Sequence, residues 1–401
     1  MIKPGCTIKI SSMSKHICII TGSRAEWGIL RPLHDELQKR VSRVSVVVTG
    51  SHLHYQSDYS AEEISKDIGE DYHQVYITPE NGAQDNQSLM FAAMAGALTR
   101  FPKLFDMFRP DLVVYLGDRY EIYAVATACR LLGIRSAHIS GGELTAGAFD
   151  DVLRHCISKL SDLHFTATED YRRRVIQLGE IPELVFNTGD LGLADLADLP
   201  FLQRSQLENL TKCALDDFFL ITLHPQTCSP GAALNGIKQL LPLLIKTYPK
   251  TRLLVTGANA DPEGEEINAY VKAQADSEPE SICFFSSLGR LNYLSAARLA
   301  RCVIGNSSSG IIEVPSLGVP VLNIGRRQQG RPHSQAVITA DFDETAILQA
   351  LGRLLADGFR EKCALFANPY EGKDSARKIA EIMASIDLNS ISREKQFHDL
   401  R

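Results

Sequence analysis

Side chains suited to acid–base chemistry are concentrated in one short stretch, AHISGGELTAGAFDDVLRH, which spans residues 137–155. It carries the carboxylates of Glu143 and Asp150 among glycines and basic side chains. Neighbouring carboxylates can divide the roles of general base and general acid when their pKa values are held apart. The spacing is not that of a metal site, so we expect catalysis by carboxylates without a metal.

A further carboxylate, Asp118, follows the apolar run DLVVYL in the sequence GDRYE, with Arg119 directly after it. A carboxylate at the end of a strand can act as a base toward a ligand bound there. Asp118 could instead only cap the helix that follows it, and Asp150 could cap the next helix. We expect the catalytic role for both.

A phosphate-binding segment is expected at GNSSSGIIE, which follows the apolar run CVIG and opens a helix. Small residues let the backbone approach a phosphate, and the hydroxyls of Ser307 and Ser308 can hold it together with free helix N–H groups. Glu313 would lie in the first turn of the helix and accept a hydrogen bond from a sugar hydroxyl. The alternative is an ordinary capped helix start.

Further candidates follow other strands. Arg24 and Gly28 belong to TGSRAEWG, where the planar guanidinium of Arg24 suits a diphosphate. This segment is not GxGxxG, so a dinucleotide cofactor is not expected. His224 ends the run FFLITL, and Arg327 lies in GRRQQGR after a later strand.

Short apolar runs separated by helical patterns must position these residues. Because the runs do not alternate with polar residues, both faces of each strand should be covered by helices, which is typical of a parallel α/β sheet. The runs fall in two series, which predict two Rossmann-like doubly wound domains with ligands bound outside the strand carboxyl ends, in a cleft between the domains. The expected strands are 16–21, 44–49, 111–116, 136–139, 163–167, 218–223, 252–256, 282–285, 302–305 and 319–324.

The domain boundaries follow from breaks in this rhythm. We expect an N-terminal extension (1–14), a first domain (15–190), a second domain (191–385) and a frayed polar tail (386–401). Pro200 and polar residues interrupt the pattern between the two domains.

Composition excludes several classes of protein. The 401 residues carry a net charge of −6 without a long basic run, which argues against nucleic acid or an anionic membrane as the main partner. No apolar stretch reaches the roughly 20 residues of a spanning helix, and the N-terminus does not resemble a signal peptide. Nine scattered cysteines without a CxxC pair predict reduced thiols and a cytoplasmic protein.

Six motifs in register, GSRAEWG, GDRYE, GGELTAGAFDDVLRH, LHPQT, GNSSSGIIEV and GRRQQGR, resemble those of the hydrolysing UDP-N-acetylglucosamine 2-epimerases of sialic acid and legionaminic acid pathways. The resemblance spans about residues 17–386. It implies the glycosyltransferase-B fold, a homodimer or homotetramer, and no cofactor. It also implies conversion of UDP-N-acetylglucosamine and water to N-acetylmannosamine and UDP, by anti elimination to 2-acetamidoglucal and then hydration.

The same resemblance implies roles for individual residues. Asp118, Asp150 and Glu143 would be the catalytic acids, and His224 would stabilise the departing UDP. Arg24 would contact the diphosphate, Glu313 the ribose, and Arg327 the uridine side. The remaining residues expected to bind the UDP-sugar are Gly28, Arg119, Ser140, Asn259, Ser307 and Ser308.

Two departures from the family pattern affect this assignment. Well-characterised members carry a glutamate where this chain has Ser140, so either Glu143 takes a share of the work or Asp118 and Asp150 suffice. The sequence RAEWGIL resembles the pattern RAE-aromatic-GLL, which is typical of the branch that includes enzymes acting on UDP-2,4-diacetamido-2,4,6-trideoxyglucose, the legionaminic acid precursor. The substrate is therefore either this sugar nucleotide or UDP-N-acetylglucosamine.

Two other functions remain open on the sequence. A glycosyltransferase of the same fold would keep the UDP site and bind an acceptor, although transfer does not need several carboxylates. A nucleotide-sugar-binding regulator without catalysis is the second, and Ser140 is the residue that favours it.

Overall fold

A computed structural model gives the structure of the chain in two compact units. The first unit comprises the described residues of Met1–Glu143, Asp150–Asp195 and Gly372–Arg401, and the second those of Leu144–Phe149 and Leu196–Glu371. Asn259 and nearly all of the expected N-terminal extension lie outside the described residues. The described residues are 14–53, 60–77, 86–145, 150–226, 231–258 and 262–400.

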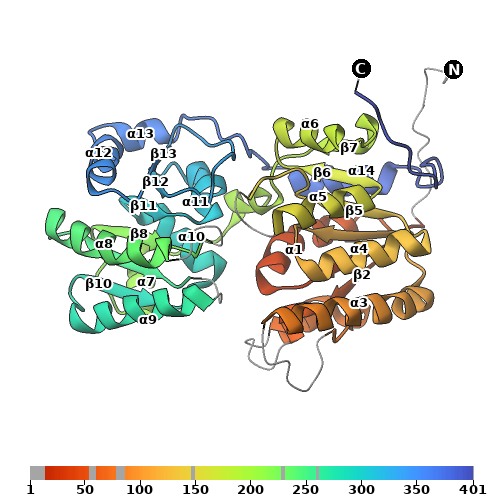
Figure 1. Cartoon of the computed structure of the whole chain (residues 1–401), viewed down its shortest axis with the longest axis horizontal. Helices are drawn as coiled ribbons and strands as arrows, with labels where there is room; N and C mark the ends of the chain where they lie inside the picture. Colours follow the sequence, from red (N-terminus) through yellow and green to blue (C-terminus); the bar gives the residue numbers. More distant parts are fainter. Residues whose placement is uncertain are drawn as a thin grey trace. The chain divides into compact units, whose positions relative to one another are not determined.

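The first unit is built on a sheet of seven parallel strands in the order β3-β2-β1-β4-β5-β6-β7 (Figure 1). Its strands and α-helices are β1 (His16–Thr21), α1 (Arg24–Gln38), β2 (Arg43–Val48), α2 (Ser60–Ile68), β3 (Tyr72–Gln74), α3 (Asn86–Phe108), β4 (Leu112–Leu116), α4 (Tyr120–Leu132), β5 (Ser136–Ile139), α5 (Asp150–Leu160), β6 (Leu163–Thr166), α6 (Glu169–Gln177), β7 (Val185–Asn187) and α14 (Ser375–Ser385).

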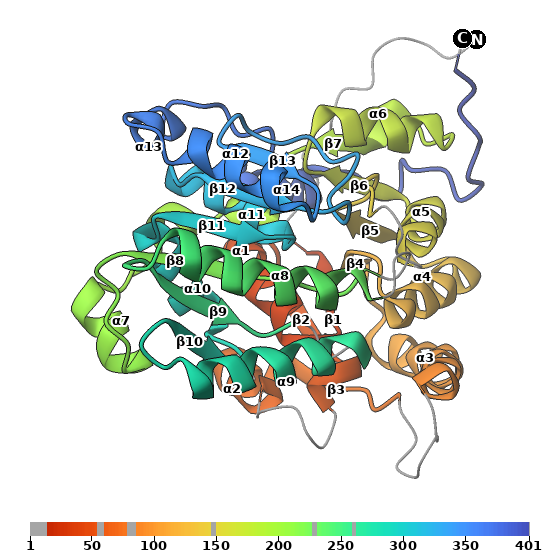
Figure 2. The same ribbon diagram turned by 60° about the vertical axis from the view of Figure 1, so that its left-hand side comes forward.

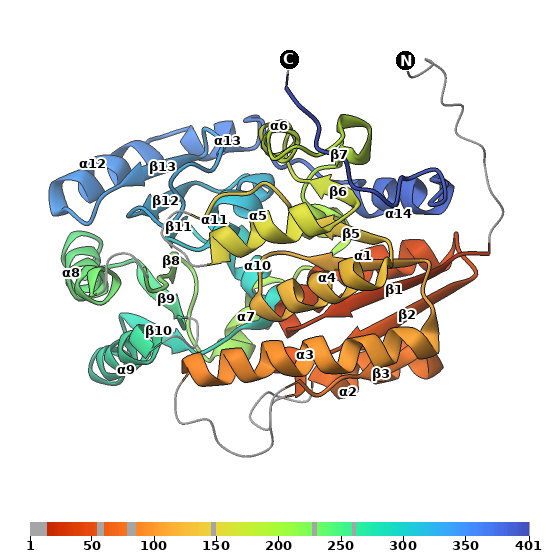
Figure 3. The ribbon, with the colours of Figure 1, turned by 45° about the vertical axis from the view of Figure 1, so that its right-hand side comes forward.

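Both faces of this sheet are buried, as the unbroken apolar runs predict. Along β1, Ile17 and Ile19 pack into the core under α1 and α14, whereas Cys18 and Ile20 pack into the core under α3 and α4. Helices α3, α4 and α5 lie side by side over that second face (Figure 3). The strand ends at the sheet's carboxyl edge are thereby held in fixed register for the loops that carry the site.

The second unit has a sheet of six parallel strands in the order β10-β9-β8-β11-β12-β13. Its strands and α-helices are α7 (Arg204–Thr211), β8 (Phe218–Thr222), α8 (Ala232–Thr247), β9 (Arg252–Thr256), α9 (Pro262–Ser277), β10 (Ile282–Phe285), α10 (Gly289–Leu299), β11 (Cys302–Gly305), α11 (Ser308–Ile312), β12 (Val321–Ile324), β13 (Val337–Ala340), α12 (Glu344–Leu354) and α13 (Phe359–Cys363). Helices α8 and α9 are neighbours over one face of this sheet (Figure 2).

These two sheets confirm the prediction of two doubly wound α/β units. All ten expected strands are present, five of them with the expected bounds and the others shifted by one or two residues. The strands β3, β7 and β13 were not predicted. All three lie at sheet edges, and β3 and β7 have only three residues each, too few to give a periodic apolar signal.

The C-terminal segment differs from the expectation in two respects: it belongs to the first unit, and its tail is ordered. Residues from Gly372 onward belong to the first unit, where Ala376, Ile379 and Met383 of α14 enter the core beneath α1. The tail after α14 is held by side chains of the first unit instead of fraying, and Ile391 is buried. Its mostly polar composition concealed this, because the tail is held through its backbone carbonyls and through Lys395, which is only partly exposed.

The cysteines also differ from the expectation in one respect. Cys213, before β8, is joined by a disulfide to Cys283 in β10, although the two are 70 residues apart in the sequence. The fold brings them together, so their spacing carried no signal. Among the other described cysteines, Cys18, Cys129 and Cys302 are buried free thiols, as expected.

In the described part of the chain, no helix combines the length and apolar character needed to cross a membrane.

Candidate functional site

Each sheet reverses its strand order once, and some of the residues singled out from the sequence, Asp118 and His224 among them, follow the strands on either side of that reversal. In the first unit these strands are β1 and β4, followed by Gly22 and Asp118. In the second unit they are β8 and β11, followed by His224 and Asn306. Ligands of open parallel sheets bind outside the strand carboxyl ends at this reversal.

Arg154 of α5 holds two carboxylates together at the edge of the first sheet. Its Nη2 donates to Oδ2 of Asp118, and its Nη1 lies 3.7 Å from Oε2 of Glu143. Burial alone would lower the pKa of Arg154, but the charges of Asp118 and Glu143 outweigh it and raise that pKa. The Asp118 side chain is 22% exposed and that of Glu143 only 6%, so Asp118 is the more accessible to a ligand.

Ser140 lies at the same edge and acts there through its backbone. Its φ of 63° places it in the left-handed region, where a side chain is strained, and its carbonyl accepts a 2.8 Å bond from Arg154 Nη1. Its own N–H donates to the carbonyl of Phe165 at 2.9 Å. Ser140 therefore shapes the turn that delivers Glu143 to Arg154.

Asp150 is the first residue of α5, one turn before Arg154 on the same helix. Residues 146–149, which connect it to Glu143, lie outside the described part of the chain. Burial, together with the charges of Glu121 and Asp150, raises the pKa of Tyr120 at the start of α4. Asp150 thus lies near the loop that carries Asp118.

A second acidic cluster surrounds the predicted residue Arg119, but its two carboxylates, Glu26 and Glu121, were not predicted from the sequence. Nε of Arg119 lies 2.6 Å from Oε1 of Glu121 and 3.6 Å from Oε1 of Glu26, and Oε2 of Glu26 accepts a 2.6 Å bond from the N–H of Gly22. Burial raises the pKa of Glu26 to about 7 against the opposing charge of Arg119. The sequence offered one signal for this cluster: a glutamate lies near the start of the helix after each of β1 and β4, in RAE and RYE.

Arg24 and Gly28, the other candidates in the first unit, are brought to the same strand end by α1. Ser23 caps this helix by accepting from the N–H of Glu26 at 3.4 Å. Arg24 is exposed in the first turn. Gly28 is half-buried one turn further on.

In the second unit, Asn306 joins the two strand ends at the reversal. Its Oδ1 accepts from the N–H of His224 at 2.7 Å and its Nδ2 donates to the carbonyl of His224 at 2.8 Å. The Asn306 carbonyl in turn accepts from Arg327 Nη1 at 3.1 Å and from Gln328 Nε2 at 2.8 Å. Asn306 was missed as a site residue, although it stands in the quoted motif GNSSSG directly after a strand.

The electrostatics of His224 follow from this setting. Burial and the charge of Arg327 lower the pKa of His224 to about 3. The imidazole is therefore neutral at physiological pH and carries one N–H donor. A neutral N–H donor and the guanidinium of Arg327 are both groups of the kind that stabilise an anion.

The expected phosphate segment has the predicted helix start but a shorter helix. Ser307 caps α11 and accepts from the N–H of Ser309 at 3.4 Å, and Ser308 is its first residue. Glu313 was expected in the first turn, but it follows the last residue of α11. Pro315 lies in the 3₁₀ turn Val314–Leu317 directly after it, and a proline cannot continue the α-helix.

Residues 35–384 of the chain match the family of UDP-N-acetylglucosamine 2-epimerases. Over 395 residues the chain is 37% identical to a GDP/UDP-N,N'-diacetylbacillosamine 2-epimerase (hydrolyzing) of Campylobacter jejuni, covering 97% of this chain and all of that protein. It is 32% identical to the polysialic acid biosynthesis protein P7 of Escherichia coli, covering 96% and 98% of the two chains.

Solved structures agree on the fold. The UDP-N-acetylglucosamine 2-epimerase of Neisseria meningitidis bound to UDP-GlcNAc superposes with a TM-score of 0.69 at 21% identity, covering 92% of this chain and 99% of that one. An S. aureus MnaA structure with UDP gives a TM-score of 0.74 at 18% identity, covering 96% and 100%. The glycosyltransferase-B type of two Rossmann-like units is thereby confirmed.

Proposed function

The chain belongs to the UDP-N-acetylglucosamine 2-epimerase family, and we propose that it is a hydrolysing 2-epimerase of a nucleoside-diphosphate 2-acetamido sugar. One observation of the site carries this proposal: Asp118 and Glu143 share the guanidinium of Arg154 at the strand-order reversal of the first sheet. A binding protein would gain nothing from crowding carboxylates there, whereas proton transfer at carbon needs them.

The proposed reaction begins with elimination. Asp118, the more exposed carboxylate, removes the proton from C2 of the sugar. The C2–H electron pair forms the C1–C2 double bond, and the C1–O bond breaks with its electrons leaving on the nucleoside diphosphate. The products of this step are a 2-acetamidoglucal and the free nucleotide.

Hydration of the glycal completes the reaction. Water adds its hydroxyl to C1 and gives up its other proton to a carboxylate of the site, while an acid supplies a proton to C2 on the opposite face from the original hydrogen. The C2 proton taken by Asp118 in the first step returns to solvent, which restores the carboxylates. We assign this acid to Asp150, because it comes from α5 and not from the loop that carries Asp118. Glu143, which is nearly buried against Arg154, keeps that guanidinium in place. It also supplies the carboxylate charge that Ser140 lacks.

The second unit is proposed to hold the nucleotide. Ser307, Ser308 and the neutral imidazole of His224 would donate to the diphosphate, while Arg327 would supply positive charge. Glu313, and Arg24 of the first unit, keep their expected contacts to ribose and diphosphate. No step needs a redox cofactor.

The substrate is proposed to be UDP-2,4-diacetamido-2,4,6-trideoxyglucose, the N,N'-diacetylbacillosamine nucleotide named for the Campylobacter relative. Identity of 37% over essentially the whole chain supports this choice. UDP-N-acetylglucosamine is the second candidate, because a relative from Neisseria meningitidis at 29% identity is a UDP-N-acetylglucosamine 2-epimerase.

Incubation with each sugar nucleotide separately, without an acceptor, tests the proposal by proton NMR. We expect free 2,4-diacetamido-2,4,6-trideoxymannose and one equivalent of UDP, with a higher kcat/KM than for UDP-N-acetylglucosamine. The GDP-linked sugar tests which nucleobase is preferred, since the name of the Campylobacter relative includes both GDP and UDP. Turnover that requires an acceptor would indicate a glycosyltransferase, and tight binding without turnover would indicate a regulator.

The expected homodimer or homotetramer stays a proposal. Light scattering of the purified protein would measure the molar mass that distinguishes the two.

A further inference from the structure

The C-terminal tail crosses the amino-terminal edge of the first sheet, opposite the edge that carries the carboxylates. Arg135 donates to the carbonyl of Ser392 at 3.0 Å, and the N–H of His398 donates to the carbonyl of Gly179 at 3.0 Å. The ring of Phe397 lies directly on Gly179, where an added Cβ would come within 2.4 Å of it. These contacts fasten the tail on both sides of Lys395.

Lys395 inserts its ammonium group at the end of α5. Its Nζ donates to the carbonyls of Lys159 at 2.7 Å and of Ser158 at 3.4 Å, and also to that of Ser161. The last carbonyls of a helix have no partner within the helix, and a cation there also interacts favourably with the helix dipole. Lys395 therefore completes α5 from a remote part of the sequence.

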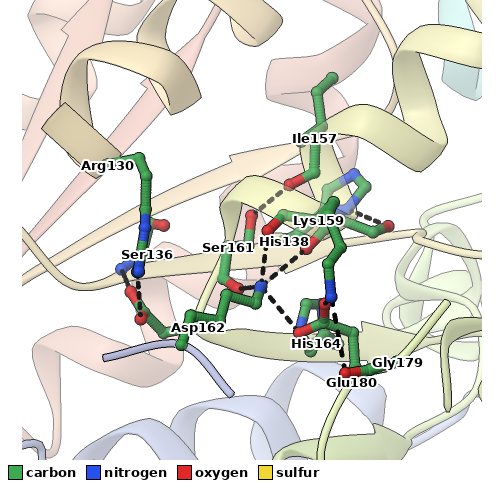
Figure 4. Close-up of polar contacts among 12 residues, drawn as sticks. Arg130, Ser136, His138, Ile157, Lys159, Ser161, Asp162, His164, Gly179 and Glu180 are labelled. Carbon is green, nitrogen blue, oxygen red and sulfur yellow. Dashed lines mark hydrogen bonds and ion pairs between the residues drawn. The ribbon is translucent and has the colours of Figure 1, made fainter. Parts of the chain in front are cut away.

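A buried carboxylate fixes Lys395 in this position. Oε2 of Glu180 lies 2.7 Å from Lys395 Nζ and 2.9 Å from Nε2 of His164, and Oε1 lies 2.8 Å from Lys159 Nζ. Figure 4 shows Glu180 beside His164 and Lys159 at the end of α5. Burial would raise the pKa of Glu180, but the bond from His164 and the charge of Lys395 hold it at about 2.

Two routes connect this end of α5 to Asp118. Along the helix itself, Arg154 lies about 7 Å from Lys159 in axial rise and contacts Asp118 directly. Across the sheet, Oγ of Ser158 lies 3.0 Å from Nδ1 of His138, and Nε2 of His138 lies 2.7 Å from the carbonyl of Gly117, the residue before Asp118. Because a carbonyl only accepts, Nε2 carries the proton, and the Ser158 hydroxyl lies within hydrogen-bond distance of both His138 Nδ1, at 3.0 Å, and the carbonyl of Arg154, at 3.2 Å.

We infer that Lys395 is a positioning residue for the proposed reaction: by completing α5 it holds Arg154 and His138, and through them Asp118, in the geometry that the chemistry needs. The inference rests on the proposed function. It gives the tail a role that its position far from the site does not suggest.

The test compares Lys395→Met with Lys378→Met, a matched change at an exposed lysine of α14, in the full-length protein. We expect kcat to fall about 10- to 100-fold in Lys395→Met with the dissociation constant for UDP unchanged, since small displacements of a catalytic group cost this much. Lys395→Arg should recover part of the rate by restoring the charge. Hydrogen exchange should rise locally in residues 117–119 and 150–160.

Three outcomes would overturn the inference. A lowered melting temperature with unchanged kcat would make the tail a stabilising element alone. An equal rise in exchange over the whole first unit would show general loosening. Unchanged kcat, melting temperature and hydrogen exchange would show that Lys395 neither positions the site nor stabilises the protein. Wild-type turnover is measured first, so an inactive wild type contradicts the proposed function and not this inference, whose exchange measurement still stands.

Discussion

The two sheets place their functional residues at the same topological position but build it from different chemistry. At the reversal of the first sheet, Arg154 and Arg119 each hold two carboxylates. At the reversal of the second sheet, an amide, Asn306, clamps a neutral histidine, and the nearby charge is the guanidinium of Arg327.

Under the proposed function, this difference separates two tasks within one fold used twice. Proton transfer to carbon needs carboxylates whose positions are fixed by a cation, which the first unit supplies. Binding a diphosphate needs donors and positive charge without competing carboxylates, which the second supplies. If this division is right, substitutions in one unit should change turnover, and substitutions in the other should change nucleotide affinity.

Asp118→Asn is the change with the largest expected effect. Asparagine keeps the size of the side chain but cannot accept the C2 proton, so we expect kcat to fall about 100- to 10,000-fold. Isothermal titration with UDP should show wild-type affinity, and Asp106→Asn on the exposed face of α3 is the control. Unchanged release of UDP in Asp118→Asn would refute its catalytic role.

Arg327→Ala should do the converse. Loss of a charged hydrogen bond to the nucleotide should weaken UDP binding by about 1–3 kcal/mol, with a smaller effect on kcat. The neighbouring exposed Arg326 provides the matched control, Arg326→Ala. Normal UDP affinity in Arg327→Ala would contradict the placement of the nucleotide in the second unit.

Glu26→Gln should change how stability depends on pH. Burial raises the pKa of Glu26 from 4.5 to about 7 in the folded protein, so its stabilising contribution is complete below pH 4.5 and is lost as pH rises through 7. Each tenfold difference in proton affinity between the folded and unfolded protein corresponds to about 1.4 kcal/mol of stability. Urea unfolding of wild type and variant between pH 4.5 and 8 measures it. Equal pH dependence, with Glu62→Gln as the exposed control, would show that Glu26 is not protonated by burial.

Ser140→Gly carries the smallest expected effect. The second sheet already has a glycine, Gly305 with φ 145°, at the end of β11, where an added Cβ would lie 1.9 Å from the carbonyl of Thr222. Ser140 has φ 63° without being a glycine, so glycine there should relieve strain and stabilise the protein by about 0.5–1 kcal/mol. Thermal unfolding checks this, and Ser140→Ala should give no gain because its backbone strain is the same. Destabilisation by Ser140→Gly would mean that the serine side chain contributes a contact that outweighs its strain.

Much of the fold could be predicted because central parallel strands are apolar on both faces. The run HICIIT gave β1 with its correct bounds, whereas the edge strand YHQ of β3 gave no signal. The positions of Asp118 and His224 after central strands could be predicted for the same reason, whereas their roles stay a proposal. Asn306, Glu26 and Glu121 were missed because their importance lies in contacts between segments, which spacing does not encode.

The tail shows the same limit more strongly. Its sequence, DLNSISREKQFHDL, is mostly polar, which is typical of a frayed end. Lys395 is nevertheless buried against carbonyls of α5 and the carboxylate of Glu180, more than 200 residues earlier in the chain. A largely buried lysine of this kind depends on partners that only the folded structure brings together.

Turnover of the diacetamido sugar nucleotide in ²H₂O tests the central claim most directly. Elimination followed by hydration must place solvent deuterium at C2 of the released mannose-configured sugar, with one equivalent of free UDP for each sugar formed. Proton NMR reads the C2 signal, and we predict its complete loss. A product that keeps its C2 proton, or that remains attached to UDP, would contradict the proposed mechanism.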